Sequence, residues 1–123
     1  MRQLKGKPVG FRDKPVPAFR TMGDGREICN TTPAGRREYH SRLVAMWLRD
    51  QGKCCLCGGI VDLNHATFEH KNGRGMGGGK RDDRISVNGI AHLGGNAIKG
   101  SRSFESYMEI PLEDRIRNCR INL

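Results

Sequence analysis

The chain has 123 residues, of which 36% are hydrophobic and 17 are glycine, so it has room for one domain with a thin core. Lys and Arg number 22 against 13 Asp and Glu, which gives a net charge of +9. The sequence contains no apolar run long enough to cross a membrane, and its basic N-terminus lacks the apolar stretch of a secretory signal. We therefore expect a cytoplasmic protein with no membrane partner.

The positive charge is concentrated in the first half of the chain. Residues 1–53 contain 12 basic and 5 acidic residues, whereas residues 54–123 contain 10 and 8. A basic segment ahead of a nearly balanced domain favours a polyanionic partner, and a solvated basic surface is the alternative. No amphipathic basic helix precedes residue 36, so nucleic acid is favoured over a membrane surface.

Two segments of different character make up the first half. Residues 1–35 hold four of the five prolines and show no helical or strand period, which predicts an extended, irregular, basic arm. Residues 36–51 predict a helix, because Tyr39, Leu43 and Trp47 belong to an apolar stripe at helical spacing. Gly52 is expected to end this helix in a left-handed conformation.

The second half predicts short elements around a glycine-rich loop. Residues 71–84 are expected to form that loop, with five glycines between positions 73 and 79. Short strands are predicted on both sides of it, at residues 60–63, 66–69 and 85–91, with a turn near Asn88 and Gly89. Short helices are predicted at 96–99, ended by Gly100, at 104–108, capped by Ser103, and from Pro111 to about Cys119.

Three groups of polar residues follow one another along the chain: Cys54-x-x-Cys57, then Glu69-His70, then Asn88 ahead of His92-x-x-Gly95-Asn96-x-x-Lys99-Gly100. This series resembles the HNH endonuclease family, and the stretch GRGMGGGKRDDRI is similar to its phage-borne branch. The resemblance covers roughly residues 54–104. It implies an α+β fold, with a small ββα-metal core, flanking helices and the irregular N-terminal arm. Residues 36–123 would then form the nuclease domain.

The resemblance implies a metal-dependent DNA endonuclease that hydrolyses phosphodiester bonds. His70 matches the family's general base, Glu69 and Asn96 match its metal ligands, and Asn88 matches the residue that tethers the loop. The chemistry of the side chains agrees, because oxygen ligands suit Mg²⁺ or Mn²⁺ and an imidazole can take a proton near neutral pH. Glu69 and His70 are neighbours, so they can share a site only at a strand end or bulge.

Each of these residues has a second interpretation. His70 can be a solvated surface histidine, and Glu69 can pair with Arg81 or Arg84. Asn96 can be a helix N-cap, and Asn88 can be part of a hairpin turn. Many relatives also have Asp in place of Glu69, and the interval between Asn88 and Asn96 is one residue shorter than is usual.

The clustered cysteines predict metal ligation in a reducing compartment. A structural zinc would be held by Cys54, Cys57 and His92. The family's fourth ligand position is Gly95, which has no ligating side chain. Cys55, Cys29, Cys119 or a water molecule can supply the fourth ligand, or the site has decayed and the cysteines are only small buried side chains.

We expect the partner to be DNA, within a bacterial or phage-infected cell. Basic residues of the loop and of the following segment are candidate phosphate contacts, with a merely flexible loop as the alternative; they are Arg74, Lys80, Arg81, Arg84, Lys99 and Arg102. A homodimer and a phage packaging machinery both remain open as partners. The rival functions are a non-catalytic zinc-ribbon-like DNA-binding module and an RNA-associated basic protein.

Overall fold

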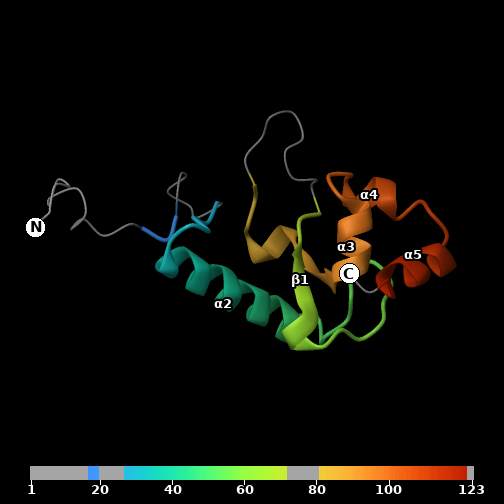
Figure 1. Ribbon diagram of the computed structural model, residues 1–123, viewed down its shortest axis with the longest axis horizontal. Helices are drawn as coiled ribbons and strands as arrows, with labels where there is room; N and C mark the ends of the chain where they lie inside the picture. The colour runs from blue at the N-terminus through green and yellow to red at the C-terminus, as the bar shows by residue number, and fades with distance from the viewer. Residues whose placement is uncertain (1–16, 20–26, 72–80, 122–123) are drawn as a thin grey trace, which may run out of the picture.

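Two short antiparallel strands lie at the centre of the computed structural model, which describes residues 17–19, 27–71 and 81–121. Strand β1 (Ala66–Glu69) pairs with β2 (Gly89–His92), so that Ala66 faces His92 and Glu69 faces Gly89. Helix α2 lies on one side of the strands in Figure 1, and the later helices lie on the other. The predicted α+β fold class is confirmed within the described residues.

The bounds predicted for β1 are correct, whereas two other strand predictions are wrong. Within residues 85–91 only the last three belong to β2, because Ile85–Val87 form a 3₁₀ turn. Residues 60–63 form no strand: Ile60 makes a single bridge to Lys53, and Leu63–His65 form another 3₁₀ turn. In both segments a 3₁₀ turn takes up part of the predicted strand and leaves too few extended residues for a ladder.

Helix α2 (Pro33–Arg49) begins three residues earlier than predicted. The Thr32 hydroxyl accepts a hydrogen bond from the Gly35 amide at 3.0 Å, and proline is favourable in the first turn because it needs no amide partner. The helix ends at Arg49 with Asp50 as its C-cap, and both Gln51 and Gly52 have positive φ. Its apolar side packs on the strands through a cluster of buried residues, Met46, Val61, Phe68 and Ile90.

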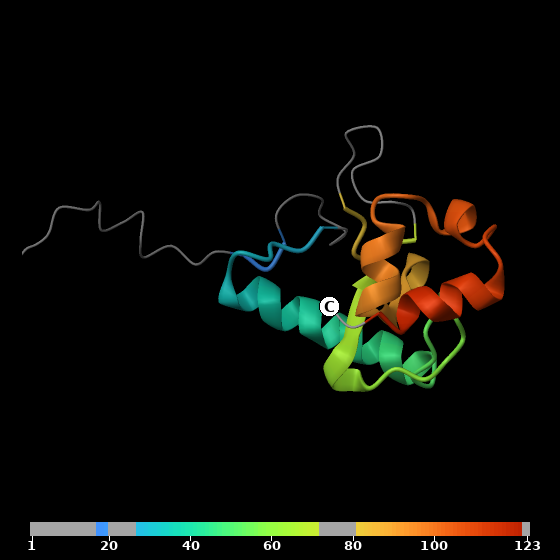
Figure 2. The same ribbon diagram turned by 45° about the vertical axis from the view of Figure 1, so that its right-hand side comes forward.

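Three short helices follow β2 and carry the second part of the core. They are α3 (Leu93–Lys99), α4 (Phe104–Tyr107) and α5 (Leu112–Cys119). The predicted ends at Gly100 and Ser103 are confirmed, whereas Pro111 is the N-cap of α5 rather than its first residue. Helices α3 and α5 lie side by side in both views (Figures 1 and 2). The buried cluster on this side contains Cys54, Leu56, Ala91, Tyr107 and Cys119.

Part of the predicted irregular arm is packed against this body. Phe19 and Ile28 form an antiparallel bridge, and the Cys29 amide donates to the Ala18 carbonyl at 2.7 Å. Ile28 is completely buried. In the described part of the chain, no helix combines the length and apolar character that crossing a bilayer requires.

Candidate metal centre and polar cleft

Four potential metal ligands from distant parts of the chain meet at one point. The ligand atoms of Cys54, Cys57, His92 and Cys119 all lie within 4.8 Å of one another. The two sulfurs of Cys54 and Cys119 are 3.8 Å apart, and Cys57 Sγ lies 3.5 Å from His92 Nδ1. Tetrahedral zinc with ordinary bond lengths separates two sulfurs by about 3.8 Å and a sulfur from a nitrogen by about 3.5 Å. The cluster therefore has the size and donor set of a zinc site.

The chain positions each ligand by a separate local structure. Cys54 and Cys57 lie in a tight turn, closed by hydrogen bonds of 2.8 Å from Gly58 N to Cys54 O and from Cys54 N to Gly59 O. His92 is the last residue of β2, and Cys119 is the last residue of α5. The site thus joins the cysteine turn, the sheet and the final helix.

Hydrogen bonds around the ligands favour metal-binding forms of these side chains. The Leu56 amide lies 3.3 Å from Cys54 Sγ, and the Gly59 amide lies 3.4 Å from Cys57 Sγ. His92 Nε2 lies 3.1 Å from the Ile60 carbonyl oxygen, which can only accept, so the Nδ1 lone pair faces the sulfurs. A hydrogen bond from the Cys119 thiol, together with backbone N–H groups, lowers the pKa of Cys54 to about 4, although burial opposes this change.

The structure chooses among the cysteines that the sequence left open. Cys119 joins the cluster, whereas Cys29 contacts Thr31 at 3.2 Å, away from it. Cys55 is also outside the cluster, and burial, followed by the charge of Glu69, raises its pKa to about 12. A high pKa disfavours the thiolate that a metal needs. Cys55 and Cys29 are therefore not the fourth ligand.

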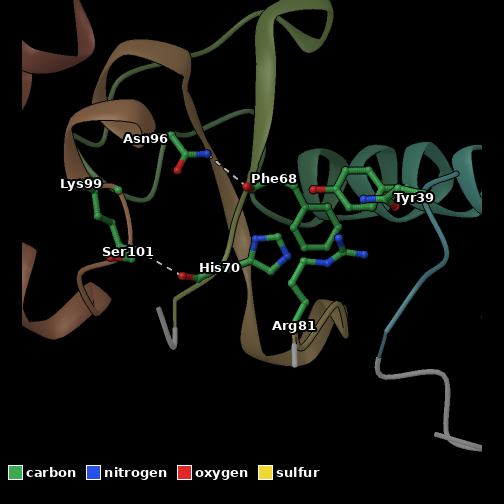
Figure 3. Close-up of a pocket in the computed structure, with 9 residues that line it drawn as sticks. Tyr39, Phe68, His70, Arg81, Asn96, Lys99 and Ser101 are labelled. Atoms are coloured by element: carbon green, nitrogen blue, oxygen red, sulfur yellow. Dashed lines mark hydrogen bonds between the residues drawn. The ribbon is translucent and has the colours of Figure 1, made fainter. Parts of the chain in front are cut away.

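A polar cleft of about 540 Å³ lies between the start of α2, the end of β1 and the end of α3. His70, Arg81 and Asn96 line it, and Figure 3 shows their side chains around one opening. Tyr39, Phe68 and Ser101 also line it. The Phe68 and His70 rings stack with their centroids 4.8 Å apart, which places the imidazole against an apolar wall.

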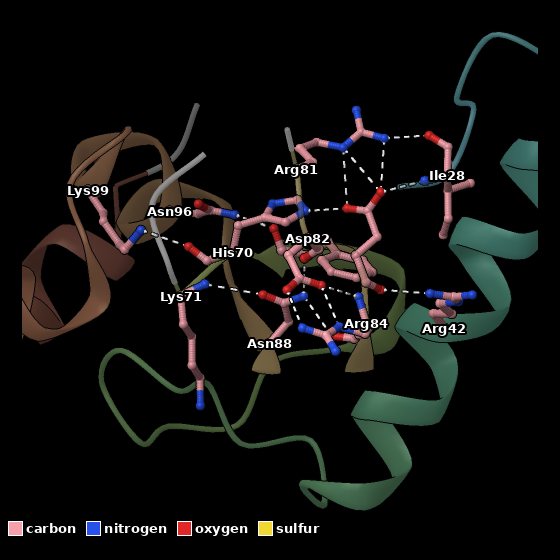
Figure 4. A network of polar contacts seen from close by, with 12 residues as sticks. Ile28, Arg42, His70, Lys71, Arg81, Asp82, Arg84, Asn88, Asn96 and Lys99 are labelled. Carbon is pink, nitrogen blue, oxygen red and sulfur yellow. Dashed lines mark hydrogen bonds and ion pairs between the residues drawn. The ribbon is translucent and has the colours of Figure 1, made fainter. Parts of the chain in front are cut away.

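His70 has a buried carboxylate as its partner. His70 Nε2 lies 2.6 Å from Oδ1 of Asp83, whose side chain is completely buried (Figure 4). The second oxygen, Oδ2, accepts from Arg81 at 3.0 Å and from the Ile28 amide at 2.9 Å. Burial raises the pKa of Asp83, but the hydrogen bonds from His70, Ile28 and Arg81 outweigh it and leave the pKa below its ordinary value. The carboxylate therefore stays charged and fixes the ring through Nε2.

Glu69 does not line the cleft that contains His70 and Asn96. Its side chain is fully buried, and Lys99 Nζ lies 2.7 Å from Oε2. Neither carboxylate oxygen has a well-aligned hydrogen bond among the described residues, so Glu69 depends on nearby positive charge, first of all that of Lys99. Burial raises the pKa of Glu69 although Lys99 opposes it. The expected shared site for Glu69, His70 and Asn96 is not formed, because the Glu69 side chain is buried against Lys99 whereas the His70 ring stacks on Phe68.

Asn96 lies within α3 rather than at its start, so the N-cap interpretation is wrong; His92 occupies the cap position. Asn96 Nδ2 donates to Thr67 Oγ1 at 3.0 Å and to the Phe68 carbonyl at 3.1 Å (Figure 3). These bonds fasten α3 to β1. The amide oxygen of Asn96 takes no part in them.

Asn88 connects the two ends of the glycine-rich loop. Its Oδ1 accepts from the Lys71 amide at 3.3 Å, and its Nδ2 donates to the carbonyls of Asp82 at 2.6 Å and Arg84 at 2.7 Å (Figure 4). Lys71 directly follows His70, so these bonds fix the backbone beside the imidazole. A contribution of Asn88 to catalysis stays a prediction.

The basic residues predicted to contact phosphate have different surroundings. Lys99 is only 2% exposed and bonds to Glu69 and to the His70 carbonyl, although it also borders the cleft, and its contact with DNA stays a prediction. Arg81 lines the cleft but is bound by Asp83, and the half-exposed Arg84 pairs with Asp82. Arg102 is exposed. Arg74 and Lys80 lie outside the described residues.

Asp83 is the site residue that sequence reasoning missed. It follows His70 by 13 positions, across the glycine-rich loop. The only signal was the pair of adjacent acidic residues at the end of that loop, Asp82 and Asp83, within an otherwise basic stretch. Comparisons with protein-family models, curated proteins and solved structures found no match to this chain.

Proposed function

We propose that the protein is an endonuclease that hydrolyses DNA phosphodiester bonds in the polar cleft, with His70 as general base. The observation that carries this proposal is the 2.6 Å contact between His70 Nε2 and the buried Asp83 carboxylate at the cleft. A carboxylate that holds one ring nitrogen orients the imidazole and stabilises it once it has taken a proton from water through the other nitrogen.

The surroundings of His70 suit a phosphate substrate. Arg81 lines the same cleft and contributes positive charge beside Asp83, and Asn96 contributes an amide. The net charge of +9 favours a polyanion, and the HNH resemblance of residues 54–104 implies a nuclease. Water would be activated on the His70 side, and the phosphate would be held beside Arg81, because both N–H groups of the Asn96 amide are already donated to Thr67 and Phe68.

The residues expected to hold Mg²⁺ or Mn²⁺ do not form a complete site. Asn96 offers one amide oxygen at the cleft, whereas Glu69 lies outside it, and its Oε2 is 2.7 Å from the Lys99 ammonium. The proposed chemistry therefore depends on His70, Asp83 and Arg81. The plasmid assay with different ions tests whether cleavage requires a divalent ion.

The test compares nicking of supercoiled plasmid by zinc-loaded wild type and by His70→Ala, with Mg²⁺, Mn²⁺, additional Zn²⁺ or no added ion. We expect the variant to lose about 10²–10⁴-fold in rate. His65→Ala is the matched control, because His65 is strongly exposed and outside the cleft. Equal rates for wild type and His70→Ala would exclude His70 as the base.

The metal cluster favours one second candidate, a zinc-stabilised DNA-binding module without catalysis. A zinc-binding module needs four ligands, and the sequence position expected for the fourth is Gly95. Cys119 supplies the fourth potential ligand of the cluster. This candidate predicts that the wild type binds DNA, that chelation of zinc abolishes binding, and that no added ion produces nicking.

A further inference from the structure

The backbone of Ile28, near the end of the predicted arm, is held at both of its polar groups. Its amide donates to Asp83 Oδ2 at 2.9 Å, and its carbonyl accepts from Arg81 at 2.6 Å (Figure 4). Ile28 itself is completely buried. Two side chains at the end of the glycine-rich loop thus bind one residue more than fifty positions earlier in the sequence.

The carboxylate that binds Ile28 also binds His70. Asp83 Oδ1 contacts the imidazole and Oδ2 receives the Ile28 amide, so the two groups lie on opposite oxygens of one buried side chain. Arg42 of α2 adds a bond of 3.1 Å to the Asp83 backbone carbonyl. Two residues after Ile28, Asn30 lines the cleft. The segment 27–30 therefore reaches the proposed site directly.

We infer that the main chain of Ile28 is a positioning element of the proposed active site, which it serves by fixing Asp83 against His70. This inference rests on the proposed function. A buried carboxylate needs several donors to hold one orientation, and the Ile28 amide is the backbone donor to the Asp83 carboxylate within the described residues. Without this donor, the Asp83 side chain can rotate and His70 loses its fixed orientation. A small displacement of a catalytic group lowers the reaction rate strongly.

This role differs from the DNA-binding role expected of the arm as a whole. Residues 1–16 contain five basic and one acidic residue, a net charge of +4, whereas residues 17–30 contain two of each, a net charge of zero. Loss of residues 1–16 should therefore weaken DNA binding and its dependence on salt. Further loss of residues 17–30 should act on the cleavage step instead.

The experiment uses two truncations, one lacking residues 1–16 and one lacking residues 1–30. We compare kcat, KM and the salt dependence of DNA affinity between them, with zinc content and circular dichroism as controls of folding. From the first truncation to the second, we expect kcat to fall on the order of 10²-fold, while KM and the salt slope change little. An equal kcat in both truncations, or a change confined to KM, would overturn the inference.

Two measurements on the full chain keep the test decisive if the protein that lacks residues 1–30 fails to fold. Ile28→Pro removes the amide donor and should lower kcat. Ile28→Val keeps the amide and should retain the kcat of the wild type. In the wild type, hydrogen exchange at the Ile28 amide should be as slow as in the core strands. Rapid exchange would overturn the contact itself. A slow amide in a wild type that cleaves no DNA would instead overturn the proposed function, and the positioning role with it.

Discussion

A Cβ atom on Gly95 would collide with Sγ of Cys119. Gly95 lies in α3, at the position where the HNH resemblance would place the fourth zinc ligand, and Cys119 comes from α5. The same glycine that cannot ligate a metal therefore provides the space in which the ligand from another helix is placed. Helices α3 and α5 pack closely there, and a Cβ on the neighbouring Gly94 would also meet the backbone of Asn118 and Ile121.

Gly95→Ala is expected to push Cys119 out of the metal cluster. The added methyl group overlaps Sγ and also crowds Leu56, so we expect a loss of about 1–3 kcal/mol in stability and a clear drop in zinc affinity. Zinc release to a chromogenic chelator, together with thermal unfolding, measures both effects. Leu93→Ala is the control, since Leu93 is in the same helix but exposed. Unchanged zinc affinity in Gly95→Ala would contradict this packing.

Cys119→Ser is expected to abolish tight binding of one zinc per chain, whereas Cys55→Ser should retain it. The reason is that Cys119 Sγ belongs to the cluster and Cys55 does not. Replacement of zinc by Co²⁺ provides the measurement, because tetrahedral cobalt bound to thiolates absorbs strongly in the visible range. Structural zinc contributes directly to folding, so Cys119→Ser should also unfold at a lower temperature. Loss of the cobalt bands in Cys55→Ser instead would reassign the fourth ligand.

Asp83 should make stability depend on pH in the acid range. Its pKa in the folded protein is lowered, because the donors His70, Ile28 and Arg81 outweigh the effect of burial. A lowered pKa stabilises the fold above the unfolded value of about 3.9, and this contribution disappears as pH falls through the lower folded pKa. Asp83→Asn should therefore be less stable than wild type at neutral pH, and the difference should shrink toward acid pH.

Urea unfolding at several pH values measures this difference. Protonation of the zinc ligands affects both proteins alike, so the difference between them isolates Asp83. Asp62→Asn serves as the comparison, because the Asp62 side chain is mostly exposed. A constant difference between wild type and Asp83→Asn across the acid range would show that this carboxylate is not selectively stabilised in the folded state.

The buried pair of Glu69 and Lys99 predicts a strong coupling in stability. Lys99→Met leaves a fully buried carboxylate without its compensating charge, and we expect a loss of about 3–5 kcal/mol. Glu69→Gln in the same chain removes the stranded charge and should recover most of that loss. Chemical denaturation of the wild type, both single variants and the double variant measures the coupling. Additive effects would mean that the two groups do not compensate each other.

Several elements follow from the local sequence. Strand β1 matches its prediction because Ala66–Glu69 lies between a turn and a glycine-rich loop. Gly100, Ser103 and Pro111 mark helix ends through their own backbone or side-chain preferences, which act over only a few residues. Cys54 and Cys57 were predicted as metal ligands because their spacing is itself a local signal, whereas His92 was predicted from the HNH resemblance.

Tertiary packing decided the rest of both sites. Cys119 is 65 residues from Cys54, and by sequence it is one of several candidates for the fourth ligand. The packing of α5 against Gly95 brings Cys119 to the cluster. Asp83 reaches His70 because the chain returns to it at the end of the loop. Glu69 is the last residue of β1 and is buried against Lys99, whereas the His70 ring packs on Phe68. Sequence spacing determines which residues share one turn or one face of an element. Which faces then meet depends on burial and charge compensation across the whole fold.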